Sequence, residues 1–152
     1  MDRNEKIDPF NKSIYTKIFK KIDGHYLLMY PDQKPLYKKL SKFLKIKKEN
    51  ILLTSGSDSA IKFIFETYTR KNDKVAYFWP TYRMIDYYCS LYGCKSKKIN
   101  YDNNLNLNLN ELVKTCRDKI KVLLIANPNQ PTGTVLNSPV LKKIINLSTS
   151  PQ

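Results

Sequence analysis

The chain has 152 residues, enough for one domain with a sizeable core, and 41% of them are hydrophobic. Its formal net charge of +14 would suit a nucleic-acid or membrane-surface partner, but the lysines are spread through every segment, whereas a binding footprint should cluster. We attribute the charge to a composition rich in Lys, Asn, Ile and Tyr, and expect neither a nucleic-acid nor a membrane partner.

Cysteine and histidine usage argues against several kinds of site. Cys89, Cys94 and Cys116 are odd in number and lack CxxC spacing, so neither a disulfide framework nor a zinc site is indicated. His25 is the single histidine, which excludes an internal His-centred triad. The start "MDRNEKIDPF" has no signal-peptide core, and no run approaches the about 20 apolar residues of a membrane helix. We expect a cytoplasmic protein.

The first third of the chain is predicted to consist of helices and connections. In chain order the segments are an extended arm at 1–11, a helix at 12–22, a connection with a short apolar strand at 23–35, a helix at 36–46 and a short buried strand at 50–56. Ile14, Ile18 and Ile22 lie four residues apart, as on one helix face.

From Ser57 the chain alternates between helices and strands. The predicted order is a helix at 57–70, a strand at 74–79, a helix at 81–93, a strand at 95–100, an Asn/Leu stretch that is strand or loop, a helix from 109, a strand at 121–126 and a helix at 138–148. Gly93 stops the second of these helices, and Ser138 and Pro139 begin the last as N-cap and first-turn residue. The alternation predicts an α/β fold with a mainly parallel sheet.

Three unusual loops begin at Thr54, Trp79 and Ala126, each directly after a predicted strand. In open parallel sheets, ligands bind outside the carboxyl ends of the strands. The three loops are therefore expected to lie together at one edge of the sheet.

The first loop runs from a strand through Ser55, Gly56, Ser57 and Asp58 into a helix. Backbone N–H groups at such a helix start attract anions by about 0.3–2 kcal/mol, and phosphate would fit beside the serine hydroxyls. The alternative is that Ser57 or Asp58 simply caps the helix. The stretch matches neither a P-loop nor a GxGxxG turn.

The second and third loops add an aromatic ring and amides. In "FWPTYRM", Tyr82 is placed to cover the sheet edge as a flat platform, although a core or rim aromatic is the alternative in a chain with 11 tyrosines. In "ANPNQPTG", Asn129 or Gln130 can offer a carboxamide N–H to an oxygen, the alternative being a proline-locked turn that leaves through Gly133. Together the loops predict a site for a flat, phosphorylated, oxygen-bearing molecule.

The stretches "YPDQKPLYKKLSKFL", "ILLTSGSDSAI", "FWPTYRMIDYY" and "ANPNQPTG" resemble the pyridoxal-phosphate-dependent aminotransferases of class I/II (fold type I), nearest to histidinol-phosphate aminotransferase-like proteins. The resemblance extends from about Asp2 to Leu136. It implies a truncated three-layer αβα large domain with a mainly parallel sheet, at residues 36–152, preceded by an N-terminal arm and helix at residues 1–35.

The resemblance also implies roles for individual residues. Gly56, Ser57 and Asp58 would hold the phosphate of pyridoxal 5'-phosphate, and Tyr82 would stack on its pyridine ring. Gln130 stands where the family has an asparagine that binds the ring hydroxyl.

Three further expectations follow from the same resemblance. Asn129 is an alternative to Gln130 as the residue that binds the ring hydroxyl. Tyr30 matches a tyrosine that reaches the cofactor phosphate of a neighbouring subunit, so a homodimer is expected. The bonds before Pro80 and Pro131 resemble positions where the family uses cis peptides.

Catalytic groups of the family have no match in this chain. The lysine that forms a Schiff base with the cofactor, the aspartate at the pyridine nitrogen and the arginine that binds substrate carboxylate should all follow Gly133. Lys142 and Lys143 come too soon and are expected to face solvent. The chain thus resembles the N-terminal part of an enzyme that transfers amino groups between an amino acid or amine and a 2-oxo acid, inactive alone. The alternatives are a basic single-stranded nucleic-acid-binding module and a degenerate partner subunit.

Overall fold

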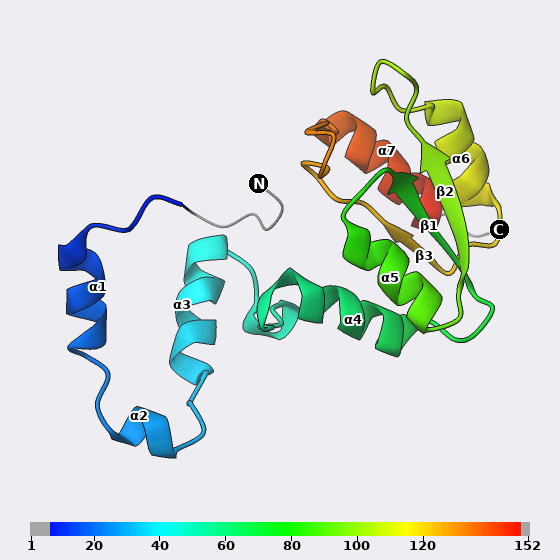
Figure 1. Cartoon of the computed structure of the whole chain (residues 1–152). Coiled ribbons are helices and arrows are strands. Elements are labelled where there is room, and N and C mark those ends of the chain that lie inside the picture. The colour runs from blue at the N-terminus through cyan, green and yellow to red at the C-terminus, as the bar shows by residue number, and fades with distance from the viewer. Residues whose placement is uncertain (1–6, 150–152) are drawn as a thin grey trace. The chain divides into compact units, whose positions relative to one another are not determined.

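The computed structural model describes residues 7–149 (Figure 1). The chain divides into two compact units, Met1–Leu52 and Leu53–Gln152. Each unit has helices of its own, and the sheet belongs entirely to the second unit.

The described part of the N-terminal unit is helical. Its elements are α1 (Lys12–Phe19), α2 (His25–Leu28), α3 (Lys34–Leu44) and the 3-10 turn η1 (Lys48–Asn50). Asn11 caps α1 by accepting a hydrogen bond from the Ser13 amide at 3.0 Å. None of α1, α2 and α3 contains a buried residue, so the predicted apolar face of α1 is exposed, with Ile18 at 56%.

Two predicted strands are wrong. Residues 25–28 form α2 instead of a strand, because the Asp23 carboxylate accepts from the His25 amide at 2.9 Å and starts a helical turn. The segment 51–54 is irregular, and Leu52 is 70% exposed. A strand needs a hydrogen-bonded neighbour, and within residues 7–149 no strand pairs with this segment.

The C-terminal unit follows the predicted alternation. Its elements are α4 (Gly56–Tyr68), β1 (Lys74–Trp79), α5 (Arg83–Leu91), β2 (Lys95–Asn100), α6 (Leu109–Arg117), β3 (Val122–Leu124) and α7 (Ser138–Thr149). The bounds of β1 and β2 agree with the prediction, and the Asn/Leu stretch before α6 is a loop with one bridge between Tyr101 and Leu107. Gly93 ends α5 with a φ of 64°, as predicted for a helix stop.

The sheet is parallel and has the strand order β2-β1-β3. Val75 of β1 pairs with Ser96 of β2 on one side and with Val122 of β3 on the other. Because all three strands run the same way, their carboxyl ends meet at one edge (Figure 1). This confirms the parallel sheet and the common edge for the loops after Trp79 and Ala126.

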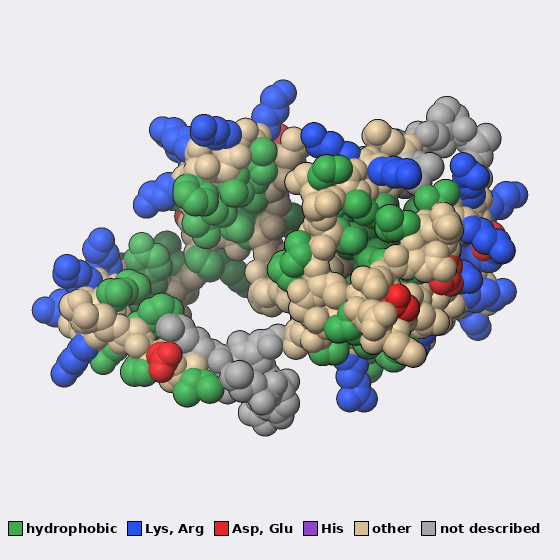
Figure 2. Space-filling view, turned by 90° about the horizontal axis from the view of Figure 1, so that it is seen from above, with side chains coloured by type: hydrophobic (Ala, Val, Ile, Leu, Met, Phe, Trp, Pro, Cys, Tyr) green, Lys and Arg blue, Asp and Glu red, His purple; other side chains and the backbone are tan. Residues whose placement is uncertain are grey.

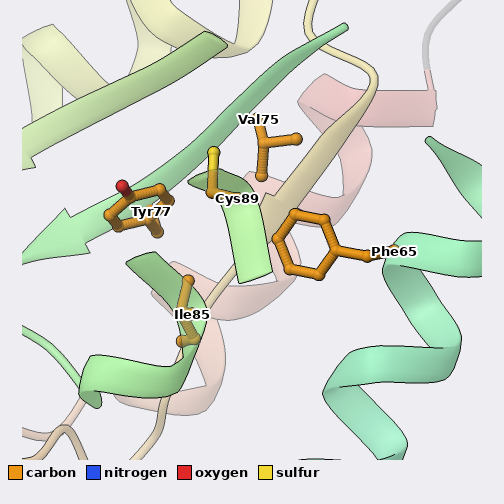
Figure 3. Close-up of a cluster of buried hydrophobic side chains, with 5 residues drawn as sticks. All are labelled: Phe65, Val75, Tyr77, Ile85 and Cys89. Atoms are coloured by element: carbon orange, nitrogen blue, oxygen red, sulfur yellow. The ribbon is translucent and has the colours of Figure 1, made fainter. Parts of the chain in front are cut away.

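Helices cover both faces of the sheet, which makes three layers. On one face Val75 and Tyr77 of β1 pack with Phe65 of α4 and with Ile85 and Cys89 of α5 (Figure 3). Since side chains alternate along a strand, the neighbouring residues of β1 serve the other face.

The second core cluster lies on that other face. Phe78 of β1 and Ile99 of β2 pack there with Leu112 of α6 and Ile144 of α7. Each large apolar side chain buried in these clusters contributes about 1.5–3 kcal/mol, so β1, which supplies both clusters, anchors the unit.

Two details near the C-terminus differ from prediction. β3 has three residues, all half-buried, whereas a buried strand was predicted at 121–126. The burial is partial because β3 forms an edge of the sheet. The cap of α7 is Asn137, whose side chain accepts from the Val140 amide at 3.1 Å, and not Ser138. The longer asparagine side chain one residue earlier takes the capping role, while Pro139 lies in the first turn as expected.

Basic side chains lie on both units. On the face shown in Figure 2, lysines and arginines surround each unit instead of gathering in one patch. In the part of the chain that the structure describes, no helix is long and apolar enough to cross a bilayer. The same residues include no group of three or more His, Cys, Asp or Glu side chains that could hold a metal ion.

Candidate functional site

The hydroxyl group of Tyr82 joins two of the three loops. It donates a hydrogen bond to Asp58 Oδ1 at 2.6 Å. Tyr82 is the N-cap of α5, directly after β1, and Asp58 lies in the first turn of α4. The hydrogen bond to Asp58, followed by partial burial, raises the pKa of Tyr82 above its ordinary value of 10.0. The first and second loops therefore meet, as predicted, although the strand expected before the first loop is not formed.

The start of α4 has no side-chain cap. Its N-cap residue is Ser55, whose side chain makes no capping hydrogen bond, and Ser57 and Asp58 lie inside the helix. The alternative that one of those two residues is the cap is therefore wrong. Gly56 has a φ of 81°, and a Cβ there would meet nothing within 4 Å. The first-turn amides, which have no intrahelical acceptor, form the positive end of the α4 dipole in open surroundings.

Asn127, the first amide of the third loop, closes the loop on itself. Its Nδ2 donates to the Leu136 carbonyl at 3.1 Å, and its Oδ1 accepts from the Leu136 amide at 2.8 Å. The Asn127 side chain thus bonds both backbone groups of Leu136, as a neighbouring strand would in a sheet. Asn127 therefore has a structural role.

Asn129, the second amide, ties the third loop to the second. It is only 3% exposed, and its Oδ1 accepts a hydrogen bond from Thr81 Oγ1 at 2.7 Å. Its Nδ2 donates to the Pro80 carbonyl at 3.0 Å and to Thr132 Oγ1 at 2.8 Å. Both amide hydrogens thus have acceptors inside the protein.

Gln130, the third amide, is exposed. Asn127 is exposed as well, whereas Asn129 is buried. The peptide bonds before Pro80 and Pro131 are cis, as the resemblance implied, and the bond before Pro128 is also cis.

Tyr30 lies in the N-terminal unit, just after α2, and its side chain is fully exposed. Of the residues singled out from the sequence, Asp58 and Tyr82 touch directly. Gly56 and Ser57 precede Asp58 along α4. Gln130 follows Asn129, which accepts a hydrogen bond from Thr81.

Thr81 is a site residue that sequence reasoning missed, and Asn129 was interpreted only as a ligand donor. A threonine between a proline and the ring-bearing tyrosine was the available signal. It is weak, because the sequence does not show that Thr81 is buried or which acceptor its hydroxyl finds.

The three loops offer binding groups but no nitrogen or sulfur nucleophile. Residues 54–58, 79–82 and 126–133 contain no lysine, histidine or cysteine. Helix-start amides, a flat ring and a carboxamide can hold an anionic, planar molecule, and the titratable side chains among them, Asp58 and Tyr82, are hydrogen-bonded to each other.

Sequence comparison supports this interpretation. Residues 15–150 match the profile of the family described as Aminotransferase class I and II. A histidinol-phosphate aminotransferase of Clostridium kluyveri is 32% identical over 149 residues, which cover 96% of this chain and 42% of that protein. One from Methanocaldococcus jannaschii is 32% identical over 136 residues, covering 88% of this chain and 36% of that protein.

Solved structures share the fold. Histidinol-phosphate aminotransferase from Sinorhizobium meliloti, in complex with pyridoxal-5'-phosphate, superposes with a TM-score of 0.79 at 18% identity, over 90% of this chain and 37% of that one. Alanine aminotransferase from Pyrococcus furiosus gives a TM-score of 0.74 at 22% identity, over 90% and 37%. The chain has the αβα architecture of fold type I, in part, and spans less than half the length of these relatives. It belongs to the class I and II aminotransferase family.

Proposed function

We propose that this chain supplies the phosphate-binding and ring-binding contacts of a pyridoxal 5'-phosphate-dependent aminotransferase. The observation that carries the proposal is the hydrogen bond between Tyr82 and Asp58, because it holds a flat ring beside the open start of α4. The relative from S. meliloti is in complex with this cofactor. When bound, pyridoxal phosphate supplies an electron sink for the carbon that carries the amino group.

The phosphate end would be held at the start of α4. The first-turn amides of Ser57 and Asp58 would donate to phosphate oxygens, helped by the helix dipole. The Gly56 amide donates to the Thr54 carbonyl at 2.9 Å, so Gly56 would contribute by letting the phosphate approach the backbone. Open space around the Cα of Gly56 supports this role, since the phosphate needs close approach to the backbone. The Ser57 hydroxyl, which is exposed, would add one more donor.

The ring would lie against Tyr82. A tyrosine held at its hydroxyl cannot swing freely, so its face is preorganised to stack on a flat ligand. Tyr82 also packs, partly buried, against the core cluster shown in Figure 3, so we propose stacking in addition to its role as an aromatic at the rim of the core.

The ring hydroxyl of the cofactor would be bound by Gln130. Asn129 was the alternative, but its side chain is buried, with 3% of its surface exposed. Gln130 is exposed and keeps the carboxamide donor that the family's asparagine provides, on an arm longer by one methylene.

Tyr30 would serve a second subunit. Its fully exposed side chain and the absence of buried residues in α1, α2 and α3 support a homodimer in which Tyr30 reaches the phosphate of the neighbour's cofactor. In this proposal residues 1–35 act as an arm and helix, and residues 36–152 form part of the cofactor-binding domain.

In the whole enzyme an amino group would pass between an amino acid or amine and a 2-oxo acid. We propose that the 152-residue polypeptide on its own binds the cofactor but does not transfer amino groups. The three loops contain no lysine, and Lys142 and Lys143 are exposed on α7.

A binding measurement tests the proposal. Pyridoxine 5'-phosphate is a suitable probe, because it has the ring and phosphate but no aldehyde to react with surface lysines. Trp79 is the single tryptophan and lies three residues before Tyr82, so its fluorescence should report saturation. Replacing Tyr82 by alanine should weaken binding by about tenfold, the loss expected for one stacking contact.

Two controls sharpen this test. Tyr87→Ala removes an exposed tyrosine from the same helix and should leave binding unchanged. Pyridoxine, which lacks the phosphate, should bind much more weakly than its phosphate ester. Equal affinity of the two probes, or unchanged affinity in Tyr82→Ala, would contradict the proposal.

A further inference from the structure

The second and third loops are joined by a buried polar pair. Among the residues whose burial the structure describes, the buried polar side chains are Thr81 at 7%, Thr115 at 2% and Asn129 at 3%. Two of these three, Thr81 and Asn129, are bonded to each other at 2.7 Å although they lie 48 residues apart in the sequence. Burial of a polar pair between two surface loops fixes how the loops sit relative to each other.

The orientation of the Asn129 carboxamide is determined by its partners. The Pro80 carbonyl can only accept, so the amide nitrogen of Asn129 must face it. That choice points Oδ1 at Thr81, whose hydroxyl then donates. Rotating the carboxamide by 180° would set two acceptors against each other. The arrangement therefore has one solution.

The same amide continues into a chain of hydroxyls at the sheet edge. Thr132 Oγ1 accepts from Asn129 Nδ2 and lies 2.8 Å from Thr134 Oγ1, which donates to the Tyr101 hydroxyl at 3.0 Å. Because the single proton of Thr134 goes to Tyr101, the proton of Thr132 goes to Thr134. This chain links the loop after β3 to Tyr101, the residue that follows β2.

The backbone of Asn129 also closes the turn that carries Gln130. The Asn129 amide donates to the Thr134 carbonyl at 2.8 Å, and the Gly133 amide donates to the Asn129 carbonyl at 2.8 Å. Residues 130–132 are thus held as a short closed loop on Asn129. A shift of Asn129 would carry Gln130 with it.

We propose that Thr81 and Asn129 are positioning residues, whose hydrogen bond sets the spacing between the ring of Tyr82 and the carboxamide of Gln130. Each buried residue directly precedes one of the two proposed cofactor contacts in the chain. The inference rests on the proposed function for its ligand. Its geometric part, that Thr81 controls the position of Gln130, concerns the protein alone.

Isosteric variants test the geometric part without ligand. Thr81→Val removes the hydroxyl and keeps the shape, so the backbone and side-chain amide resonances of Gln130 should shift in the ¹H–¹⁵N spectrum of the whole chain. Thr81→Ser keeps the hydroxyl and should leave Gln130 near its original position. Thr115→Val is the matched control, since the Thr115 hydroxyl is buried with no hydrogen-bond partner. Unmoved Gln130 resonances in Thr81→Val, or an equal movement in Thr115→Val, would overturn the inference.

A measurement on the unaltered chain covers the case in which Thr81→Val does not fold. The side-chain amide protons of buried Asn129 should exchange with water at least about tenfold more slowly than those of exposed Asn127. Equal exchange rates would overturn the inference as well.

Two probes then separate positioning from general stability. Affinity for pyridoxine 5'-phosphate should fall about tenfold in Thr81→Val and stay near the original value in Thr81→Ser. Affinity for inorganic phosphate should not change, because the phosphate end rests on α4. Equal weakening of both probes would mean a general structural loss and would contradict positioning. If the unaltered chain bound neither probe, the proposed function would fail, while the ligand-free spectra would still decide the role of Thr81.

Discussion

Lys98 Nζ of β2 lies 2.9 Å from Asp86 Oδ1 in the first turn of α5, and the same carboxylate oxygen accepts a hydrogen bond from the Tyr77 hydroxyl of β1. Lys98 Nζ also lies 3.9 Å from the centre of the Trp79 ring. These contacts attach the end of α5 that carries Tyr82 to two strands. They also explain how a strand as rich in lysine as "KSKKIN" is accommodated, because Lys98 finds an acid and an aromatic face.

Replacing Asp86 by asparagine should lower the free energy of unfolding by about 1 kcal/mol at neutral pH, since about a third of each side chain of the pair is exposed. The Tyr77 hydrogen bond, followed by Lys98, lowers the pKa of Asp86 below its ordinary value of 3.8. A lowered pKa stabilises the folded state above pH 3.8, and this contribution is lost as pH falls through the folded pKa. Urea unfolding across pH 2–7 should show the two proteins converging at low pH.

Asp118→Asn is the control for that experiment. Asp118 pairs with Lys74 at 3.0 Å, but both side chains are about half exposed. Its loss should cost less than the loss of Asp86. A larger effect at Asp118 would contradict the attachment role given to Asp86.

The contact between Tyr82 and Asp58 should be visible in a tyrosine titration. Because the Asp58 carboxylate accepts from the hydroxyl, the pKa of Tyr82 is raised above 10.0. In Asp58→Asn one tyrosine should titrate closer to pH 10, as followed by absorbance at alkaline pH. The stabilisation from this bond is present below pH 10.0 and lost as pH rises through the folded pKa. Identical titrations of the two proteins would show that the contact is absent.

Phe65 should be a main support of α4. It is fully buried between α4, β1 and α5, and its ring stacks on Tyr92 with centroids 5.9 Å apart. Phe65→Ala should destabilise the C-terminal unit by about 3–5 kcal/mol through the cavity it leaves. Phe63→Ala, on the same helix but 42% exposed, should cost much less. Comparable losses in denaturant unfolding would refute the assigned core.

Gly93 should tolerate asparagine better than alanine. Its φ of 64° is left-handed, and a Cβ would lie 3.2 Å from Lys71 Cγ. Alanine there should cost about 1–2 kcal/mol, whereas asparagine, which visits this region more readily, should cost less. Thermal unfolding of both variants measures the difference. Equal melting temperatures for the original protein and Gly93→Ala would contradict the predicted strain of a side chain at this left-handed position.

Lysine labelling examines whether the polypeptide holds the cofactor covalently. Incubation with pyridoxal 5'-phosphate followed by borohydride should mark exposed lysines without strong preference, because the three loops contain none. Peptide mapping gives the distribution. A single lysine labelled far ahead of the others would contradict the proposal that the 152-residue chain binds without transferring amino groups.

The sequence predicted the strands well where residues that break or end strands lie on both sides of them. β1 and β2 begin and end as expected, since glycine, proline and charged residues bound them, and the parallel order follows from the alternation with helices. The strand expected at 50–56 was wrong, because pairing depends on a neighbour that a local pattern cannot show. The apolar faces of α1 and α3 predicted helices but not their exposure.

The site was predicted in outline only. The rule for carboxyl ends of parallel strands predicted that Asp58 and Tyr82 lie together, although the strand expected before Asp58 is not formed. The same reasoning could not tell which amide of the third loop is buried, because Asn127, Asn129 and Gln130 are chemically alike and only the folded loop separates them. Thr81 was missed because the sequence does not show that it is buried or which acceptor its hydroxyl finds.

The central claim is that the start of α4, Tyr82 and Gln130 form one site for a phosphorylated ring. Titrating pyridoxine 5'-phosphate into ¹⁵N-labelled chain measures this most directly. The account predicts that the amide resonances of Ser57, Tyr82 and Gln130 move together with one dissociation constant. Movement of only one of the three, or shifts confined to other parts of the chain, would contradict it.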